Sequence, residues 1–125
     1  MTMTQAELKI RTKRFALRAM KVVRALPQDI PGKVIAHQLM RSATSVAANY
    51  RAACRGRSKA EFIAKVGVAL EEADESELWL ELIVEEGMLP PNRCAPLLKE
   101  ADELVSIFVA TKNTAQTAGR AKSEI

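Results

Sequence analysis

Hydrophobic residues near the start of the chain repeat with the period of an α-helix. Between residues 5 and 25 the apolar positions recur at alternating steps of four and three. This spacing turns one side of a helix towards a core and leaves the other side to solvent. The stripe consists of Leu8, Thr12, Phe15, Ala19, Val22 and Leu26. We therefore predict an amphipathic helix over residues 5–25.

A second periodic segment follows a proline-containing turn. Asp29 is a candidate helix cap, and Pro31 is acceptable within a first helical turn, which predicts a helix over residues 30–55. Gly56 can adopt the left-handed conformation that ends a helix. The main apolar line of this helix is Ile35, Leu39, Ala43, Val46, Tyr50 and Ala53.

Two more helices complete the pattern. Ser58 and Glu61 have the spacing of a capping box, in which each side chain bonds the backbone N–H of the other, and this predicts a helix over residues 59–86. Gly87 and the prolines after it predict a stop, with Asn92 as the cap of a helix over residues 93–113. Short loops between four long helices predict an all-α protein, an antiparallel up-and-down four-helix bundle. A single domain should span residues 1–114, and residues 115–125 should form a flexible tail.

The middle two helices carry a second face beside the apolar one. Arg41, Ser45 and Asn49 share such a face on one helix, and Glu75 and Trp79 share one on the next. A buried carboxylate needs a partner, and Arg41 and Asn49 are available to Glu75. We predict a polar network between helices or subunits built from Arg41, Ser45, Asn49, Glu75 and Trp79.

The net charge of +4 conceals an asymmetry along the chain. Residues 1–70 carry 14 Lys and Arg against 3 Asp and Glu, a difference of +11, whereas residues 71–125 carry 5 against 12, a difference of −7. Such asymmetry indicates either a surface that binds polyanions or a basic helix that lies beside an acidic one. The sequence leaves both interpretations open.

Two groups of basic residues are candidates for contact with nucleic acid. The first forms a ridge along one helix at spacings of three, four and three, and the second surrounds the turn that contains Gly56. Phosphate contacts require only accessible donors of this kind. The alternative is a solvated face, or ion pairing with the acidic third helix. The candidates are Arg11, Arg14, Arg18, Lys21, Arg51, Arg55, Arg57 and Lys59.

Patterns for catalysis and metal binding are missing from the sequence. The one histidine, His37, has no glutamate three residues before it, so the paired Glu-x-x-His motif of di-iron bundles cannot be assembled. Cys54 and Cys94 lack metal-ligand spacing and are expected to be reduced. We predict a protein that is not an enzyme and has no metal or cofactor. The chain lacks an apolar signal core and a run of about 18 apolar residues, so we expect it in the cytoplasm and not in a membrane.

The segment MRSATSVAANYRAACRGRSKAEFIAKVGVALEEADESELWLELI resembles a bacterial four-helix-bundle family. The family was first noted as open reading frames in intervening sequences of large-subunit ribosomal RNA genes, and it is related to the accessory variability protein of diversity-generating retroelements. The resemblance covers about Phe15 to Phe108. Where the family pattern has a Glu after the Asn, this chain has Ala53. The residues that carry the resemblance are Arg41, Ser45, Val46, Asn49, Arg57, Ser58, Glu61, Phe62 and Glu75.

This resemblance implies a homopentamer around a central axis, without enzymatic activity. For the retroelement member it implies a basic assembly that binds nucleic acid and a reverse transcriptase. Two faces on the middle helices are compatible with a cyclic homo-oligomer, because each subunit needs one face for its core and another for a neighbour. We therefore predict a non-catalytic oligomer that binds RNA or DNA. The alternative is an adaptor or scaffold for a protein such as a polymerase, without direct contact to nucleic acid.

Overall fold

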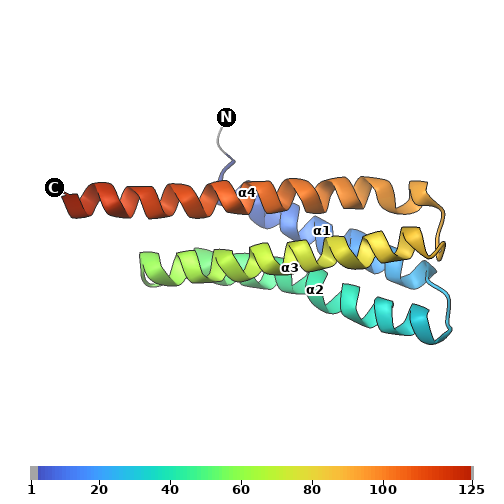
Figure 1. Ribbon diagram of the computed structural model, residues 1–125. Coiled ribbons are helices and arrows are strands. Elements are labelled where there is room, and N and C mark those ends of the chain that lie inside the picture. The colour runs from blue at the N-terminus through green and yellow to red at the C-terminus, as the bar shows by residue number, and fades with distance from the viewer. Residues whose placement is uncertain (1–2, 125) are drawn as a thin grey trace.

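The computed structural model describes residues 3–124, and the side chains of residues 3–118. All regular secondary structure in that part of the chain is helical. Consecutive helices run in opposite directions, and α1 contacts both α2 and α4 (Figure 1). The predicted all-α four-helix bundle is thereby confirmed. The helices are α1 (Gln5–Ala25), α2 (Ile30–Cys54), α3 (Lys59–Glu85) and α4 (Pro91–Glu124).

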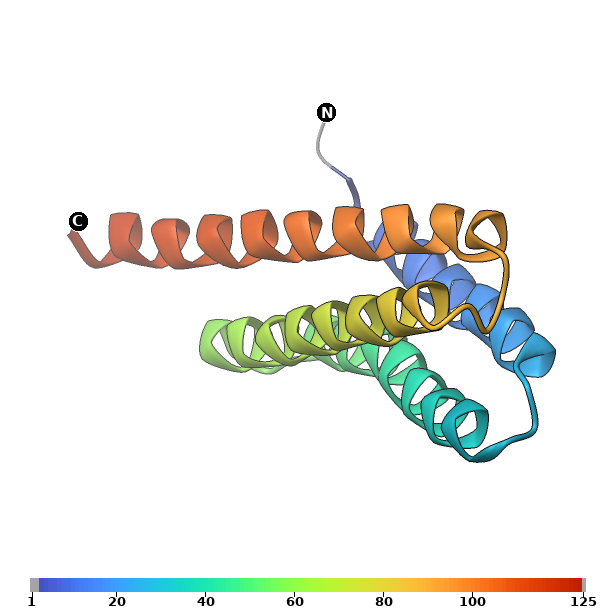
Figure 2. The same cartoon turned by 45° about the vertical axis from the view of Figure 1, so that its right-hand side comes forward.

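The last helix is longer at both ends than the sequence pattern predicts. It begins at Pro91, because proline is well suited to a first helical turn, so Asn92 lies inside the helix and is not its cap. It ends at Glu124, and its last turns run past the start of α3 (Figures 1 and 2). The predicted helix end near residue 113 is therefore wrong. Ala and Gln have high helix propensity, which allows the helix to continue without an apolar stripe.

The beginnings of three helices are fixed by side-chain caps. Thr4 and Glu7 form a complete capping box at α1, with bonds of 3.1 and 3.2 Å. The Asp29 carboxylate accepts the Gly32 N–H at 2.9 Å, which confirms Asp29 as the cap of α2. Gly32 itself has no room for a side chain, because a Cβ there would lie 2.0 Å from the Pro27 carbonyl oxygen. This contact sets the tight connection between α1 and α2.

The turn between α2 and α3 differs in two details from the prediction. Ser58 accepts the Glu61 N–H at 3.1 Å, but the Glu61 carboxylate accepts the N–H of Arg57, not that of Ser58. Gly56 is not left-handed, since Gly87 is the glycine with a positive φ in the described chain. Space is nevertheless tight at position 56, where a Cβ would lie 3.0 Å from the Ala53 carbonyl oxygen.

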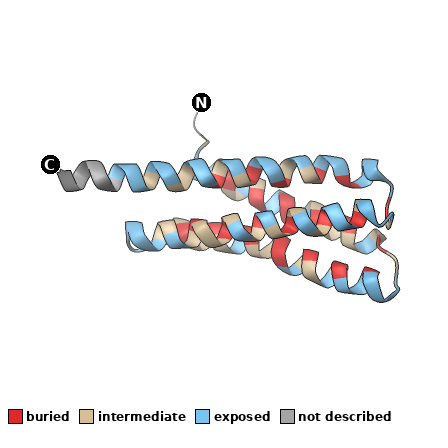
Figure 3. Cartoon of the chain, in the orientation of Figure 1, coloured by how far each residue is buried: buried red, intermediate tan, exposed pale blue. Residues whose placement is uncertain are grey.

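The core runs along the inward faces of all four helices (Figure 3). Aliphatic residues dominate it, and the rings of Tyr50 and Phe108 pack with centroids 5.9 Å apart. Small residues let α2 and α3 approach closely: Ser42, Ala43 and Ala73 are fully buried. The N-terminal half of α2 diverges from α3 (Figure 2). Helices α2 and α3 therefore meet closely near the middle of α2, where Ser42 contacts Ser76.

Candidate nucleic-acid interface

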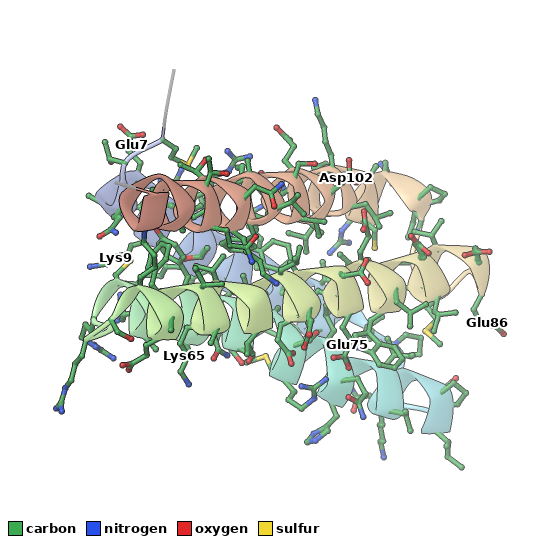
Figure 4. The ribbon with its side chains drawn as sticks, turned by 60° about the vertical axis from the view of Figure 1, so that its left-hand side comes forward. Glu7, Lys9, Lys65, Glu75, Glu86 and Asp102 are labelled. Atoms are coloured by element: carbon green, nitrogen blue, oxygen red, sulfur yellow. The ribbon has the colours of Figure 1, made fainter. Side chains whose placement is uncertain are left out.

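Two polar contacts join α2 to α3, and they do not form the single network that the sequence predicted. Arg41 bonds Glu75 and, at 3.1 Å, Glu72, with Gln38 as a further acceptor at 3.2 Å. The hydrogen bond to Glu75 raises the pKa of the Arg41 guanidinium. Figure 4 shows Glu75 on the side of α3 nearest α2. This cluster is largely exposed, with the Arg41 side chain 43% accessible, so it joins the helices at the surface of the bundle.

Asn49 does not reach Arg41 or Glu75. Its amide donates to the Ser45 hydroxyl at 2.8 Å and to the Ser45 carbonyl oxygen at 2.9 Å, both within α2. The predicted network therefore separates into an Arg41 cluster and a local Asn49–Ser45 pair. Competition explains the separation, because the serine one turn away offers Asn49 a nearer acceptor.

A buried hydroxyl pair, which sequence reasoning missed, lies at the centre of the α2–α3 contact. The oxygens of Ser42 and Ser76 are 2.8 Å apart, and both residues are fully buried. Ser76 also donates to the Glu72 carbonyl oxygen at 2.8 Å, while the contact of Ser42 with the Leu39 carbonyl oxygen is longer, 3.4 Å. The sequence offered one signal for this pair, a serine on the inward face of each helix, because a buried hydroxyl requires a hydrogen-bond partner.

Trp79 lies half-buried on α3, and its indole nitrogen is buried without a hydrogen-bond partner in the described part of the molecule. Val34 lies two turns before Arg41 on the same face of α2, and Leu82 lies two turns after Glu75 on the same face of α3. Val34 and Leu82 are exposed, at 54% and 38%. An apolar surface with an unused donor is typical of a contact region.

The basic candidates divide into one paired residue and a group of accessible ones. Arg11 bonds Glu100 with two contacts of 2.7 Å, and this hydrogen bonding raises the pKa of the Arg11 guanidinium. Glu103 lies 3.4 Å from the same guanidinium. Arg11 is thus committed to α4 and does not belong with the accessible cations. Arg18 is half-buried, and the other candidates are exposed: Arg14, Lys21, Arg51, Arg55, Arg57 and Lys59.

The charges of the folded protein are divided between two sides. Among the described side chains, Arg11 and Arg41 are the cations of α1 and α2 that form ion pairs. The remaining cations of these helices face solvent or clefts, whereas most carboxylates lie on α3 and α4. Basic and acidic helices therefore do lie side by side, but their ion pairs neutralise few of the charges. A basic side formed by α1 and α2 remains.

Acidic side chains lie close together on the opposite side of the bundle. Burial raises the pKa of Glu77 on α3, and the nearby carboxylates of Asp102, Glu81 and Asp74 raise it further. Repulsion between carboxylates across the α3–α4 contact is thus one cause of the raised pKa of Glu77. Like-charge repulsion therefore opposes the ionisation of Glu77 on the acidic side.

A groove of about 830 Å³ opens between the start of α1, the start of α3 and α4. Its apolar walls include Met3, Leu8 and Phe62, and its charged residues are Asp102, Glu103 and the paired Arg11. No group of three or more His, Cys, Asp or Glu side chains within the described residues could hold a metal ion. Cys94 is buried, and burial raises the pKa of its thiol; Cys54 is half-buried, and neither forms a disulfide.

Fold and charge distribution define the chain as an antiparallel helical bundle with one basic and one acidic side. Residues 5–110 match the family model described as 23S rRNA-intervening sequence protein. The chain therefore belongs to the 23S rRNA-intervening sequence protein family. This confirms the family expected from the segment around Arg41 to Glu86.

A solved structure supports the same assignment. It is a protein of unknown function from the S23 ribosomal protein family of Bacteroides thetaiotaomicron, which is 29% identical to this chain with a TM-score of 0.82. The similarity covers 89% of this chain and 99% of the other. No curated protein sequence matches. Within the described residues, none of the helices has the length and apolar character needed to cross a lipid bilayer.

Proposed function

We propose that this protein is a non-catalytic nucleic-acid-binding protein that holds the phosphate backbone of RNA or DNA on its basic side. The observation that supports this most directly is the set of accessible, unpaired cations on α1 and α2, among them Arg14, Lys21 and Arg51. Cations that lie on the same side repel each other, and a bound polyanion relieves that repulsion. Binding also releases the counterions that surround the nucleic acid, which favours the complex.

The groove and the buried polar groups support a binding role without catalysis. The groove's one cation is already paired with Glu100 and Glu103, and its other charged groups are exposed carboxylates. An acid–base mechanism needs titratable groups that converge on one reacting centre. Arg41, Asn49 and Glu75 hold positions between and within helices, so we assign them a structural role.

We also propose that the protein acts as a cyclic homo-oligomer, a pentamer, as its family resemblance implies. Val34, Leu82 and the unpartnered indole nitrogen of Trp79 favour a neighbouring subunit on the α2–α3 side. The Leu82→Glu variant should form smaller assemblies, with a lower molar mass in light scattering. The Val109→Glu variant, which changes an exposed residue of α4, should keep the mass of the unchanged protein. Equal masses for the two variants and the unchanged protein would contradict this interface.

The test of nucleic-acid binding is a salt titration with a short duplex RNA followed by fluorescence anisotropy. Arg14→Gln/Lys21→Gln removes two exposed cations from the basic side, and Arg93→Gln/Lys99→Gln removes two from α4 as a control of equal charge. The first variant should reduce the slope of log K against log salt by about 2, because each phosphate contact contributes roughly 0.9. The control should change the slope by less than half as much.

A protein adaptor is the second candidate function, in which a different protein, and not a neighbouring subunit, covers the exposed apolar side of α2 and α3. An adaptor predicts no binding to duplex or single-stranded RNA and DNA even at low salt. That result would refute the nucleic-acid proposal and leave a protein partner, such as a polymerase, as the ligand of this surface.

A further inference from the structure

A small cleft between α1 and α2 is lined by cations that the sequence pattern did not bring together. Its volume is about 230 Å³, and we call it the α1–α2 notch. Because the two helices are antiparallel, the start of α1 meets the end of α2 here, and Figure 4 shows Lys9 at the opposite end of the molecule from Glu86. The notch is lined by Lys9, Thr12, Lys13, Ala47, Ala48 and Arg51.

The notch carries three positive charges, and no acidic residue lines it. Lys9 and Lys13 lie one helical turn apart, a spacing at which like charges repel by roughly 0.2 to 0.5 kcal/mol, and Arg51 approaches from the other helix. Helix α2 contains no Asp or Glu, and the one acid of α1, Glu7, is held in the capping box with Thr4. None of the three cations forms an ion pair in the described structure. An anion in the notch removes this repulsion.

The shape of the notch follows from small side chains on α2. Ala47 and Ala48 leave open the space that longer residues would fill, and the neighbouring turns of α1 supply the two lysines. The buried Thr12 hydroxyl donates to the Lys9 carbonyl oxygen at 3.1 Å, so it is already used within α1. Two ammonium groups and a guanidinium are therefore the donors that remain for a ligand. A planar guanidinium can hold two oxygens of one phosphate, and each ammonium adds a compact charge.

The surroundings favour a phosphate within a polymer. Arg55 is exposed one turn beyond Arg51, so the positive charge continues past the notch along α2. Arg14 adds an exposed cation on a neighbouring face of α1. Binding of single-stranded bases usually uses exposed aromatic rings. Among the described side chains, every Phe, Tyr and Trp ring is buried or half-buried. This combination fits the backbone of a double helix, whose bases are already stacked.

We infer that the α1–α2 notch binds a backbone phosphate of double-stranded nucleic acid through Lys9, Lys13 and Arg51. The inference rests on the proposed function and names the point of closest contact. It adds Lys9 and Lys13 to the residues that contact nucleic acid and replaces Arg11, which pairs with α4. Recognition at this point is independent of base sequence, because it involves no base edge.

Two single variants and one control test the notch by anisotropy with a random-sequence duplex RNA. Lys13→Gln and Arg51→Gln each remove one exposed notch cation, and Lys33→Gln removes an exposed cation of α2 outside the notch. Each notch variant should weaken binding about three- to eightfold at 0.1 M salt and reduce the salt slope by about 0.5 to 0.9, the upper value being the complete loss of the one phosphate contact of the notch. The control should weaken binding less than twofold. If both notch variants weaken binding no more than Lys33→Gln, the inference is overturned while the proposed function stands.

A second measurement examines the notch without nucleic acid. Inorganic pyrophosphate is titrated into protein with ¹³C-labelled alanine methyl groups, because Ala47 and Ala48 line the notch. The two methyl signals should shift in a saturable way, and Arg51→Gln should abolish the shift. Unmoved signals overturn the notch as an anion site. If the unchanged protein fails to bind duplex RNA at low salt, the proposed function is refuted, and this titration then decides the notch alone.

Discussion

Removing the Arg11 guanidinium should destabilise the fold and leave nucleic-acid binding intact. The pair of Arg11 with Glu100 joins α1 to α4 through two contacts of 2.7 Å, and the two side chains are only 25% and 13% exposed. Exposed ion pairs contribute about 0 to 1 kcal/mol, whereas breaking a fully buried pair costs about 3 to 5 kcal/mol. With solvent reaching part of this pair, we expect Arg11→Met to lower the free energy of unfolding by about 2 kcal/mol.

The assay is urea unfolding at a fixed protein concentration, since the proposed assembly would make stability depend on concentration. Arg14→Met is the matched control, because Arg14 is exposed on the same helix without an ion pair, and it should cost less than about 0.5 kcal/mol. A double variant, Arg11→Met/Glu100→Met, should recover about half of the loss, because an apolar pair leaves no carboxylate without a partner. Duplex RNA affinity should fall in Arg14→Met and not in Arg11→Met.

Two results would refute this reasoning. If Arg11→Met and Arg14→Met have the same stability within about 0.5 kcal/mol, the pair with Glu100 contributes nothing. If Arg11→Met weakens RNA binding as much as Arg14→Met does, Arg11 contacts nucleic acid despite its carboxylate partner.

Three further substitutions examine the packing and the charge of the bundle. Gly32→Ala should destabilise the fold by about 1 to 3 kcal/mol in a thermal melt, because its Cβ would meet the Pro27 carbonyl oxygen at 2.0 Å. Gly67→Ala should stabilise the fold in the same assay, because the nearest atom to its Cβ would lie 3.5 Å away. Ser76→Ala should cost about 1 to 2 kcal/mol and Ser42→Ala less, since only Ser76 retains a 2.8 Å backbone acceptor when its partner is lost; equal losses in urea unfolding would contradict this. The pKa of Glu77 is raised in the fold, so its ionisation lowers the free energy of unfolding as pH rises through the folded-state pKa. Glu77→Gln should therefore stabilise the protein at neutral pH and have little effect near pH 4. An equal gain in stability at both pH values would contradict the raised pKa.

Much of the bundle could be predicted because apolar periodicity and capping residues mark its helices in the sequence. The stripe from Leu8 to Leu26 and the cap at Asp29 depend only on residues close in sequence, and the structure confirms both. The end of α4 could not be found in this way, since the apolar stripe ends before the helix does. Gly56 shows a related limit: glycine signals either a left-handed turn or a close approach, and only the packed structure distinguishes the two.

The candidate site was harder to predict because its members come from different helices. Helical spacing groups Arg14 and Lys21 on one ridge, and both are exposed, but nothing local reveals that Arg11 turns towards Glu100, which lies far along the chain. Lys9 and Lys13 belong to no ridge of the sequence pattern and gain importance only because α2 brings Arg51 beside them. Asn49 was assigned to a distant carboxylate, although Ser45 within its own helix satisfies it first.

Uneven placement of charge gives this bundle a permanent electric dipole across its width, from the carboxylates of α3 towards the cations of α1 and α2. In the field of any polyanion such a molecule experiences a torque before it makes contact. If nucleic acid is the ligand as proposed, this torque would turn α1 and α2 towards it before contact. In the proposed complex, the surface that faces away from the bound strand would be negative and would repel a second strand.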